Sequence, residues 1–174
     1  MSTLEVKAIQ APSGYNLQMP AGHIVQVVQG FTTDIFTTTS SSFTDITGLS
    51  ASITPKSTSN KILVSFNTHI SGSTTSGHTV MLRCLRGSTV IGAGVGASNR
   101  VPASGLLYSK YTYTVENKSY EYLDSPNTTS ATTYKVQIVP ENGATAVVNK
   151  SSQDGDYTYH GRFASTITLM EVQG

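Results

Sequence analysis

Apolar and polar residues alternate with a period of two along much of this chain, which is typical of β-strands that bury one face. Lys61–Ile70 is the clearest segment of this kind. One face of it carries Ile62, Val64, Phe66, Thr68 and Ile70. The opposite face is polar except for Leu63. Ala164–Val172 alternates in the same way and is the predicted closing strand.

Two pairs of segments predict β-hairpins. Thr79–Leu85 is separated from Thr89–Ile91 by a short turn with glycine at its tip. Thr133–Val139 is followed by a turn that contains Asn-Gly and then by Ala144–Val148. Because Asn-Gly between two strand patterns is the strongest short-range hairpin signal, we expect this second pair to form adjacent antiparallel strands.

Weaker strand patterns fill the rest of the chain. They are Ile24–Gln29, Ser42–Ile46, Leu49–Thr54, Lys110–Val115 and Ser119–Leu123. The Ser/Thr run Thr37–Ser42, flanked by Phe36 and Phe43, predicts an edge strand with a polar outer face. No window has the apolar spacing of an amphipathic helix. Nine or ten short strands separated by turns predict an all-β fold, an antiparallel β-sandwich of the jelly-roll type, over residues 23–174.

Residues 1–22 differ from the rest and predict an extended N-terminal arm. Two proline-containing breaks surround a short apolar segment there, which cannot build a core of its own. Such an arm either stays loose or adds a strand to a partner. The candidate partner-binding residues of the arm are Leu4, Val6, Ile9, Leu17 and Met19.

Composition excludes several classes of function. Charged residues make up 12% of the 174 residues, about half the usual share, and 48 Ser and Thr residues take their place. The net charge is +1 and basic residues are scattered, so we expect no nucleic-acid partner. No apolar run approaches the ~20 residues of a membrane span, and the first residues lack the features of a signal peptide. The single cysteine, Cys84, indicates folding in a reducing cytoplasm.

Motifs for catalysis or metal binding are absent from the sequence. The glycine-rich segment Gly92–Ser98 lacks the spacing of a phosphate-binding loop and predicts a plain loop or bulged strand. The four histidines lack ligand spacing, and Cys84 has the apolar neighbours of a buried structural thiol. Asp154 and Asp156 could face a Ca²⁺ ion, but the rest of a calcium loop is missing, which favours a solvated turn. We therefore predict no catalytic residue, no metal and no cofactor, and a protein that is not an enzyme.

Tyrosines crowd the second half of the chain, with Tyr157 and Tyr159 following the main group. The candidates for a shared face are Tyr108, Tyr111, Tyr113, Tyr120 and Tyr122. Tyrosine combines a large apolar ring with a polar tip, so these residues suit a receptor or ligand face. A half-buried sandwich surface or an interface between subunits is the alternative interpretation, and the sequence favours it.

Several phrases of the sequence resemble, in their order, a family of small virion structural proteins of tailed bacteriophages that is frequent in aquatic and cyanobacterial phages. The phrases are Ser2–Gln10, Ala21–Gln29, Ser42–Pro55, Ser59–Val64, Leu123–Val136 and Ser165–Val172. The resemblance covers nearly the whole chain. It implies a non-enzymatic homotrimer with a jelly-roll body, made in the host cytoplasm and placed on the virion surface, with other capsid or tail proteins as partners.

Two roles on a virion remain open. A tail fibre needs a stalk of heptads or repeated β-units, and this sequence contains neither. A short arm with one globular body therefore favours capsid cement or decoration. The alternative is a tail-fibre or tail-tip protein that binds a host-surface receptor or glycan.

Overall fold

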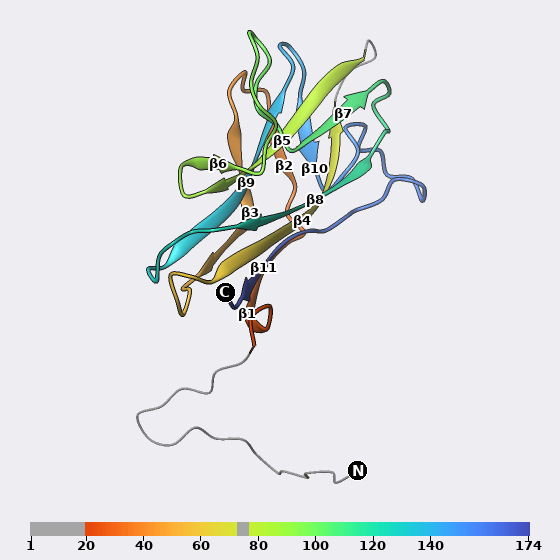
Figure 1. Ribbon diagram of the computed structural model, residues 1–174. Coiled ribbons are helices and arrows are strands. Elements are labelled where there is room, and N and C mark those ends of the chain that lie inside the picture. Colours follow the sequence, from red (N-terminus) through yellow and green to blue (C-terminus); the bar gives the residue numbers. More distant parts are fainter. Residues whose placement is uncertain (1–19, 73–76) are drawn as a thin grey trace, which may run out of the picture.

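Two antiparallel β-sheets pack face to face in the computed structural model, which describes residues 20–72 and 77–174 (Figure 1). The described strands are β1 (Ile24–Thr32), β2 (Phe36–Thr38), β3 (Thr44–Ile53), β4 (Lys61–Gly72), β5 (His78–Arg86), β6 (Thr89–Ile91), β7 (Gly105–Ser109), β8 (Glu116–Asp124), β9 (Thr132–Pro140), β10 (Ala146–Val148) and β11 (Ser165–Val172). The predicted all-β sandwich is confirmed.

The strand order is that of a jelly roll. One sheet runs β1-β11-β4-β8, and the short strands β10 and β2 extend it beside the end of β4. The other sheet runs β3-β9-β5, with β7 and β6 pairing to successive parts of β5. The main pairs are therefore nested, as β5 with β7, β4 with β8, β3 with β9 and β1 with β11. A chain folded into one long hairpin and then rolled over gives this arrangement.

The core lies between the two sheets and consists of the inward residues of each strand. On β4 these are the predicted residues Ile62, Val64, Phe66, Thr68 and Ile70, all at most 1% exposed. Ile167 and Leu169 of β11 pack with them, as the alternation predicted. Leu63 faces outward, so it is an apolar residue on the otherwise polar outer face of this strand.

Ser42–Ile46 and Leu49–Thr54 were expected as separate strands, but the structure makes them one strand, β3. The pairing register with β9 shifts between Asp45 and Ser50, and Gly48 has a φ of 81°. Between these two paired positions β3 advances five residues while β9 advances two, and this bulge of three extra residues lets Ile46 and Leu49 both face the core although they are three residues apart. Glycine suits the bulge because this φ is costly for other residues.

One predicted hairpin is confirmed and the other is wrong. Thr79–Leu85 and Thr89–Ile91 pair as β5 and β6. Thr133–Val139 and Ala144–Val148 fall in β9 and β10, which belong to different sheets. The Asn-Gly turn does form, since the Ala144 amide donates to the Glu141 carbonyl at 3.0 Å. Both edges of β9 are already paired with β3 and β5, so the chain crosses to the other sheet and β10 pairs with β4 and β2.

The region before β8 also differs from expectation. Lys110–Val115 was predicted as a strand, but this is wrong: the segment turns, and the Thr114 amide donates to the Tyr111 carbonyl at 3.1 Å. The strand here is β7, which the sequence analysis missed. The buried Ser109 hydroxyl donates to the Gly72 carbonyl and so fixes the end of β7 against β4. The predicted polar edge strand is shorter than expected, since only Phe36–Thr38 pairs at the sheet edge.

The start of β1 and the C-terminus lie at one end of the sandwich, and the connections that precede β8 and β11 lie at the other. Ile24 at the start of β1 pairs with Val172 at the end of β11, and Figure 1 shows the C-terminus at this lower end. The starts of β8 and β11 lie at the other end, roughly 26 Å away along eight residues of strand. The arm candidates Leu4, Val6, Ile9, Leu17 and Met19 lie outside the described residues, and the division at residue 22 stays a prediction.

Candidate functional site

The five predicted tyrosines do not share one face. Tyr108 lies on β7, Tyr111 and Tyr113 lie in the β7–β8 connection, and Tyr120 and Tyr122 lie on β8. The last two lie on the inward face of the edge strand β8, opposite Phe66 and Val64, and 38% of Tyr122 remains exposed. The Tyr120 hydroxyl donates to the Gly92 carbonyl and its ring centroid is 5.8 Å from that of Phe66. Tyr122 packs against Gly92 as well, so these two rings hold the glycine-rich loop on the body.

Tyr111 and Tyr113 form a stacked pair on the surface. Their ring centroids are 5.4 Å apart and their planes differ by 6°. The turn between them brings the rings together, and 60% of Tyr113 is exposed. A large exposed aromatic surface of this kind is costly in water unless it meets a partner.

A second stacked pair comes from the β10–β11 connection. The centroids of Tyr157 and Tyr159 are 5.2 Å apart, with planes that differ by 4°, and 76% of Tyr159 is exposed. The edge of His160 meets both rings. The Gly155 amide donates to His160 Nδ1 at 3.0 Å, which ties the ends of this aromatic turn together.

Ion pairs close the loop that carries this second pair. Lys150 Nζ lies 2.9 Å from the Asp154 carboxylate, which also pairs with Arg162. Lys150 and Arg162 form an isolated β-bridge. The hydrogen bonds from Arg162 and Lys150 lower the pKa of Asp154, so its carboxylate stays ionised and occupied by two cations. Little of its charge remains for the Ca²⁺ ion considered from the sequence.

Backbone and side-chain hydrogen bonds join the two loops. The backbone N–H of Gln153 donates to the Thr112 carbonyl at 2.8 Å, and the Thr112 hydroxyl donates to the side-chain oxygen Oε1 of Gln153 at 3.0 Å. The Ser151 hydroxyl donates to the Gln153 carbonyl at 2.6 Å. Phe163 stacks on His69 of β4 at 4.8 Å between centroids, which fixes the base of the loop to the sheet.

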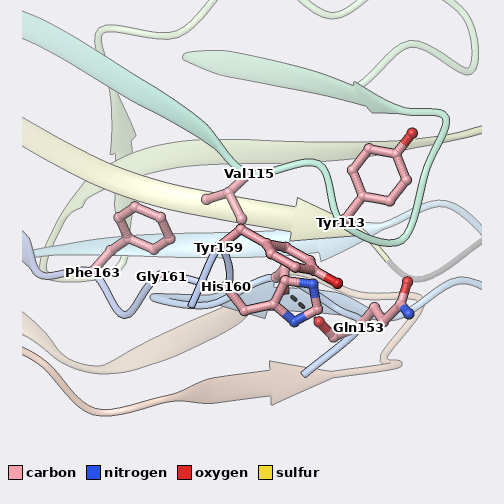
Figure 2. Close-up of a pocket in the computed structure, with 8 residues that line it drawn as sticks. Tyr113, Val115, Gln153, Tyr159, His160, Gly161 and Phe163 are labelled. Carbon is pink, nitrogen blue, oxygen red and sulfur yellow. Dashed lines mark hydrogen bonds between the residues drawn. The ribbon is translucent and has the colours of Figure 1, made fainter. Parts of the chain in front are cut away.

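A cavity of about 450 Å³ lies between these two loops, and we call it the tyrosine pocket. It is lined by Tyr113, Val115, Ser151, Gln153, Tyr159, His160, Gly161 and Phe163. Figure 2 shows Tyr113 and Gln153 on one side of His160 and Phe163 on the other. Its volume is in the range of small-molecule sites, and its lining combines aromatic rings with polar groups and contains no Asp, Glu, Lys or Arg side chain.

Sequence reasoning named Tyr113 but missed the rest of this pocket. Tyr159, His160 and Phe163 belong to a segment without strand periodicity, and their meeting with Tyr113 depends on the jelly-roll topology. The sequence does carry one indication of this site, because Gly155 and Gly161 flank the aromatic residues and let the rings pack against the backbone. A Cβ on Gly155 would lie 2.7 Å from the Tyr157 ring, and one on Gly161 would lie 2.8 Å from that of Phe163.

The other cavities and reactive side chains are weaker candidates for a functional site. One of about 550 Å³ lies at Phe43, Met81 and Glu141, and the Glu141 carboxylate there already accepts hydrogen bonds from the Thr79 amide and hydroxyl. Cys84 is buried, as predicted. Within residues 20–72 and 77–174, no three His, Cys, Asp or Glu side chains gather where they could hold a metal ion. The described part of the chain has no helix long and apolar enough to cross a membrane.

Comparison of the whole chain with known proteins gives no assignment. No protein-family model matches the sequence, and no curated protein is similar to it.

Proposed function

We propose that this chain is a non-enzymatic structural protein of a bacteriophage particle, a homotrimer that serves on the virion surface as capsid cement or decoration. One observation of the structure carries the self-association. A row of apolar side chains crosses the outward face of the sheet β1-β11-β4-β8, where an isolated domain would expose polar residues.

The row follows directly from the strand register. Val27 of β1 is opposite Met170 of β11, Met170 is opposite Leu63 of β4, and Leu63 is opposite Leu123 of β8. All four side chains point away from the core. Val27 is 56% exposed and Leu123 is 44% exposed, and Val25 and Phe31 add further exposed apolar surface on β1.

The two rows beside the apolar one on this sheet face are mostly polar and contain one charged residue. The row next to the apolar one consists of Gln29, Thr168, Ser65 and Glu121. The row after it consists of Phe31, Thr166, Asn67 and Ser119. Interface centres are depleted of charged residues because charges are expensive to desolvate, so this face suits contact with a second copy of the chain. The proposed number of subunits, three, is taken from the resemblance to virion proteins.

The two ends of the sandwich support a role on a surface. Gly22 and His23, just before β1, are hydrogen-bonded to Gln173 at the same end as the C-terminus, and the tyrosine pocket lies toward the other end. Attachment through Leu4, Val6, Ile9, Leu17 and Met19 would therefore leave the pocket end facing outward. These arm residues remain a prediction from the sequence.

Light scattering tests the self-association with a matched pair of variants. We expect a trimer for the full-length protein and monomers for Leu123→Glu, because the new carboxylate would be buried against the apolar surface of a second copy. Leu106→Glu is the control, since Leu106 is 48% exposed on β7 of the other sheet. A monomeric wild type at micromolar concentration, or a trimeric Leu123→Glu, would overturn the trimer.

Antibody labelling of purified particles of the virus that encodes the chain tests the location. Label distributed over the capsid supports cement or decoration, and absence of the chain from the particles would overturn the virion role. Label confined to the tail tip would favour the second candidate, a tail-fibre or tail-tip protein that binds a host-surface receptor or glycan. The exposed aromatic rings of the tyrosine pocket are the observation that favours this candidate.

A further inference from the structure

We infer that the tyrosine pocket is a binding site for a neutral sugar, with Tyr113 and Tyr159 as the stacking rings. This inference gives the ligand class of the second candidate function and rests on that candidate, but it does not depend on the trimer or on the place of the protein in a particle. Three features of the pocket support it.

The first feature is the way the rings are exposed. Tyr113 and Tyr159 are each stacked on a second tyrosine, Tyr111 and Tyr157 respectively. The stacking holds each ring in place while most of it faces solvent. A pyranose ring has one face of C–H bonds, which are weakly positive, and the face of an aromatic ring is negative. A flat, fixed and exposed tyrosine is therefore a suitable surface for a sugar ring.

The second feature is the set of hydrogen-bonding groups beside the rings. Gln153 accepts the Thr112 hydroxyl through Oε1, so its Nε2 amide is directed to other partners. His160 contacts Gly155 through Nδ1, which leaves Nε2 as the ring atom for a ligand. Together with the tyrosine hydroxyls, these groups supply both donors and acceptors, as the hydroxyl rim of a sugar requires.

The third feature is the composition of the pocket lining, which contains no Asp, Glu, Lys or Arg side chain. Three charged residues of the same loop, Lys150, Asp154 and Arg162, are paired with one another, and the fourth, Asp156, is exposed on the surface. An acidic sugar, a phosphate or a nucleic acid would find no Lys or Arg side chain in the lining to pair with. A quaternary ammonium ion also binds aromatic rings, so choline is the competing ligand that the experiment must separate.

The pocket is also organised before any ligand arrives. Hydrogen bonds between Thr112 and Gln153 lock the two loops together, and the Asp154 ion pairs close the second loop. A site that is already ordered loses little conformational freedom on binding, which matters for a weak ligand such as a single sugar.

Saturation-transfer NMR on the full-length protein tests the inference directly. The probes are methyl glycosides of glucose, galactose, mannose and N-acetylglucosamine, with methyl glycosides of glucuronic and N-acetylneuraminic acid and choline chloride as comparisons. The variants are Tyr159→Ala, Tyr159→Phe and, as the matched control, Tyr108→Ala, because Tyr108 is equally an exposed tyrosine but lies outside the pocket lining.

We expect at least one neutral glycoside to bind, with the affinity reduced at least about tenfold in Tyr159→Ala and nearly kept in Tyr159→Phe and Tyr108→Ala. Binding of only choline or only the acidic glycosides would overturn the inference. So would no neutral glycoside bound at about 20 mM, or an equal loss in Tyr108→Ala. Tyr159 does not belong to the apolar row, so the native mass of every variant should stay that of the wild type. A failed sugar test with an intact trimer would therefore leave the virion proposal standing.

Discussion

Asn60 donates a hydrogen bond of 2.6 Å through Nδ2 to Oε1 of Glu171, a carboxylate that is fully buried on β11. The Lys56 backbone amide donates to the same oxygen at 2.6 Å, and Gln26 Nε2 donates to the other oxygen at 2.5 Å. The single carboxylate thus joins β1, β11 and the β3–β4 connection at the end of the sandwich where the chain enters and leaves.

Glu171 should make the stability of the protein depend on pH. Burial by itself raises the pKa of this carboxyl group, but the hydrogen bonds from Asn60, Gln26 and Lys56 outweigh it, so the pKa lies below its usual 4.5. A lowered folded-state pKa adds stability above the unfolded pKa, and this stability is lost as the pH falls through the folded value. We expect Glu171→Gln to reduce the free energy of unfolding by about 1–3 kcal/mol at pH 7 and by less at pH 3. Urea titrations at both pH values measure this.

The control for this experiment is Asp156→Asn, which removes a carboxylate that is exposed on the surface. It should leave the free energy of unfolding within about 0.5 kcal/mol of the wild type. If Glu171→Gln proved equally destabilised at both pH values, the ionised form of Glu171 would not be the source of its contribution.

Asp124 should couple the two sheets energetically. It lies on β8, and it accepts hydrogen bonds from Arg86 at 2.8 Å and from the Tyr134 hydroxyl at 2.7 Å, both on the opposite sheet. Burial, followed by the bond to Asp124, raises the pKa of Tyr134, which keeps its hydroxyl protonated as a donor. Asp124→Ala should cost about 2–4 kcal/mol, because it leaves a buried hydroxyl without a partner.

A double-mutant cycle isolates this effect. In the Tyr134→Phe background the orphaned hydroxyl is absent, so Asp124→Ala should cost at least about 1 kcal/mol less there than in the wild type. Urea unfolding of the four proteins measures the difference. Strictly additive costs would mean that the hydroxyl and the carboxylate do not depend on each other.

The fold was readable from the sequence where a local pattern and the tertiary structure agree. The alternation in Lys61–Ile70 named the inward residues of β4 correctly because one face of this strand meets the core. The Asn-Gly turn before Ala144 misled because turn chemistry fixes only the direction of the chain. Which strands then pair depends on the edges still free, and both edges of β9 were taken by strands distant in sequence.

The candidate site was less readable for the same reason. Tyr111 and Tyr113 alternate as they would on a strand, and only the structure places them in a turn. Their partners in the pocket, Tyr159 and Phe163, are more than forty residues away in sequence and in a segment without periodicity. Pairing of β4 with β8 and of β11 with β4 brings these two connections to one end of the sheet.

Cys84 should report on opening of the sandwich. Its thiol is buried in the core, and burial is the main cause that raises its pKa from 9.0 to about 12. A rise of that size leaves about a thousandth of the thiolate that an ordinary cysteine has at pH 8, and the thiolate is the reactive form. We expect the folded protein to react with a disulfide reagent at least about 10³-fold more slowly than the protein in 6 M guanidinium.

The chain contains no other cysteine, so a spectrophotometric thiol assay reads this position alone. In Asp124→Ala the reaction should accelerate in step with the lost stability, since reagent reaches the thiol through opening of the sheets. A fast reaction in the native wild type would show that the space between the two sheets at Cys84 admits solvent and reagent.

Gly92 and Gly94 test whether the glycine-rich loop is fixed to the body by Tyr120 and Tyr122. A Cβ on Gly92 would lie 2.6 Å from Cγ of Tyr122, and the φ of Gly92 is +55°, whereas Gly94 has open space around it. Gly92→Ala should therefore lower the free energy of unfolding by about 1–3 kcal/mol through strain and displaced rings. Gly94→Ala should stay within about 0.5 kcal/mol of the wild type. Urea unfolding gives both values, and near-UV circular dichroism reports the tyrosine packing. Equal stability of the two variants would mean that the loop lifts away at no cost, and Tyr120 and Tyr122 would then be available as a ligand face after all.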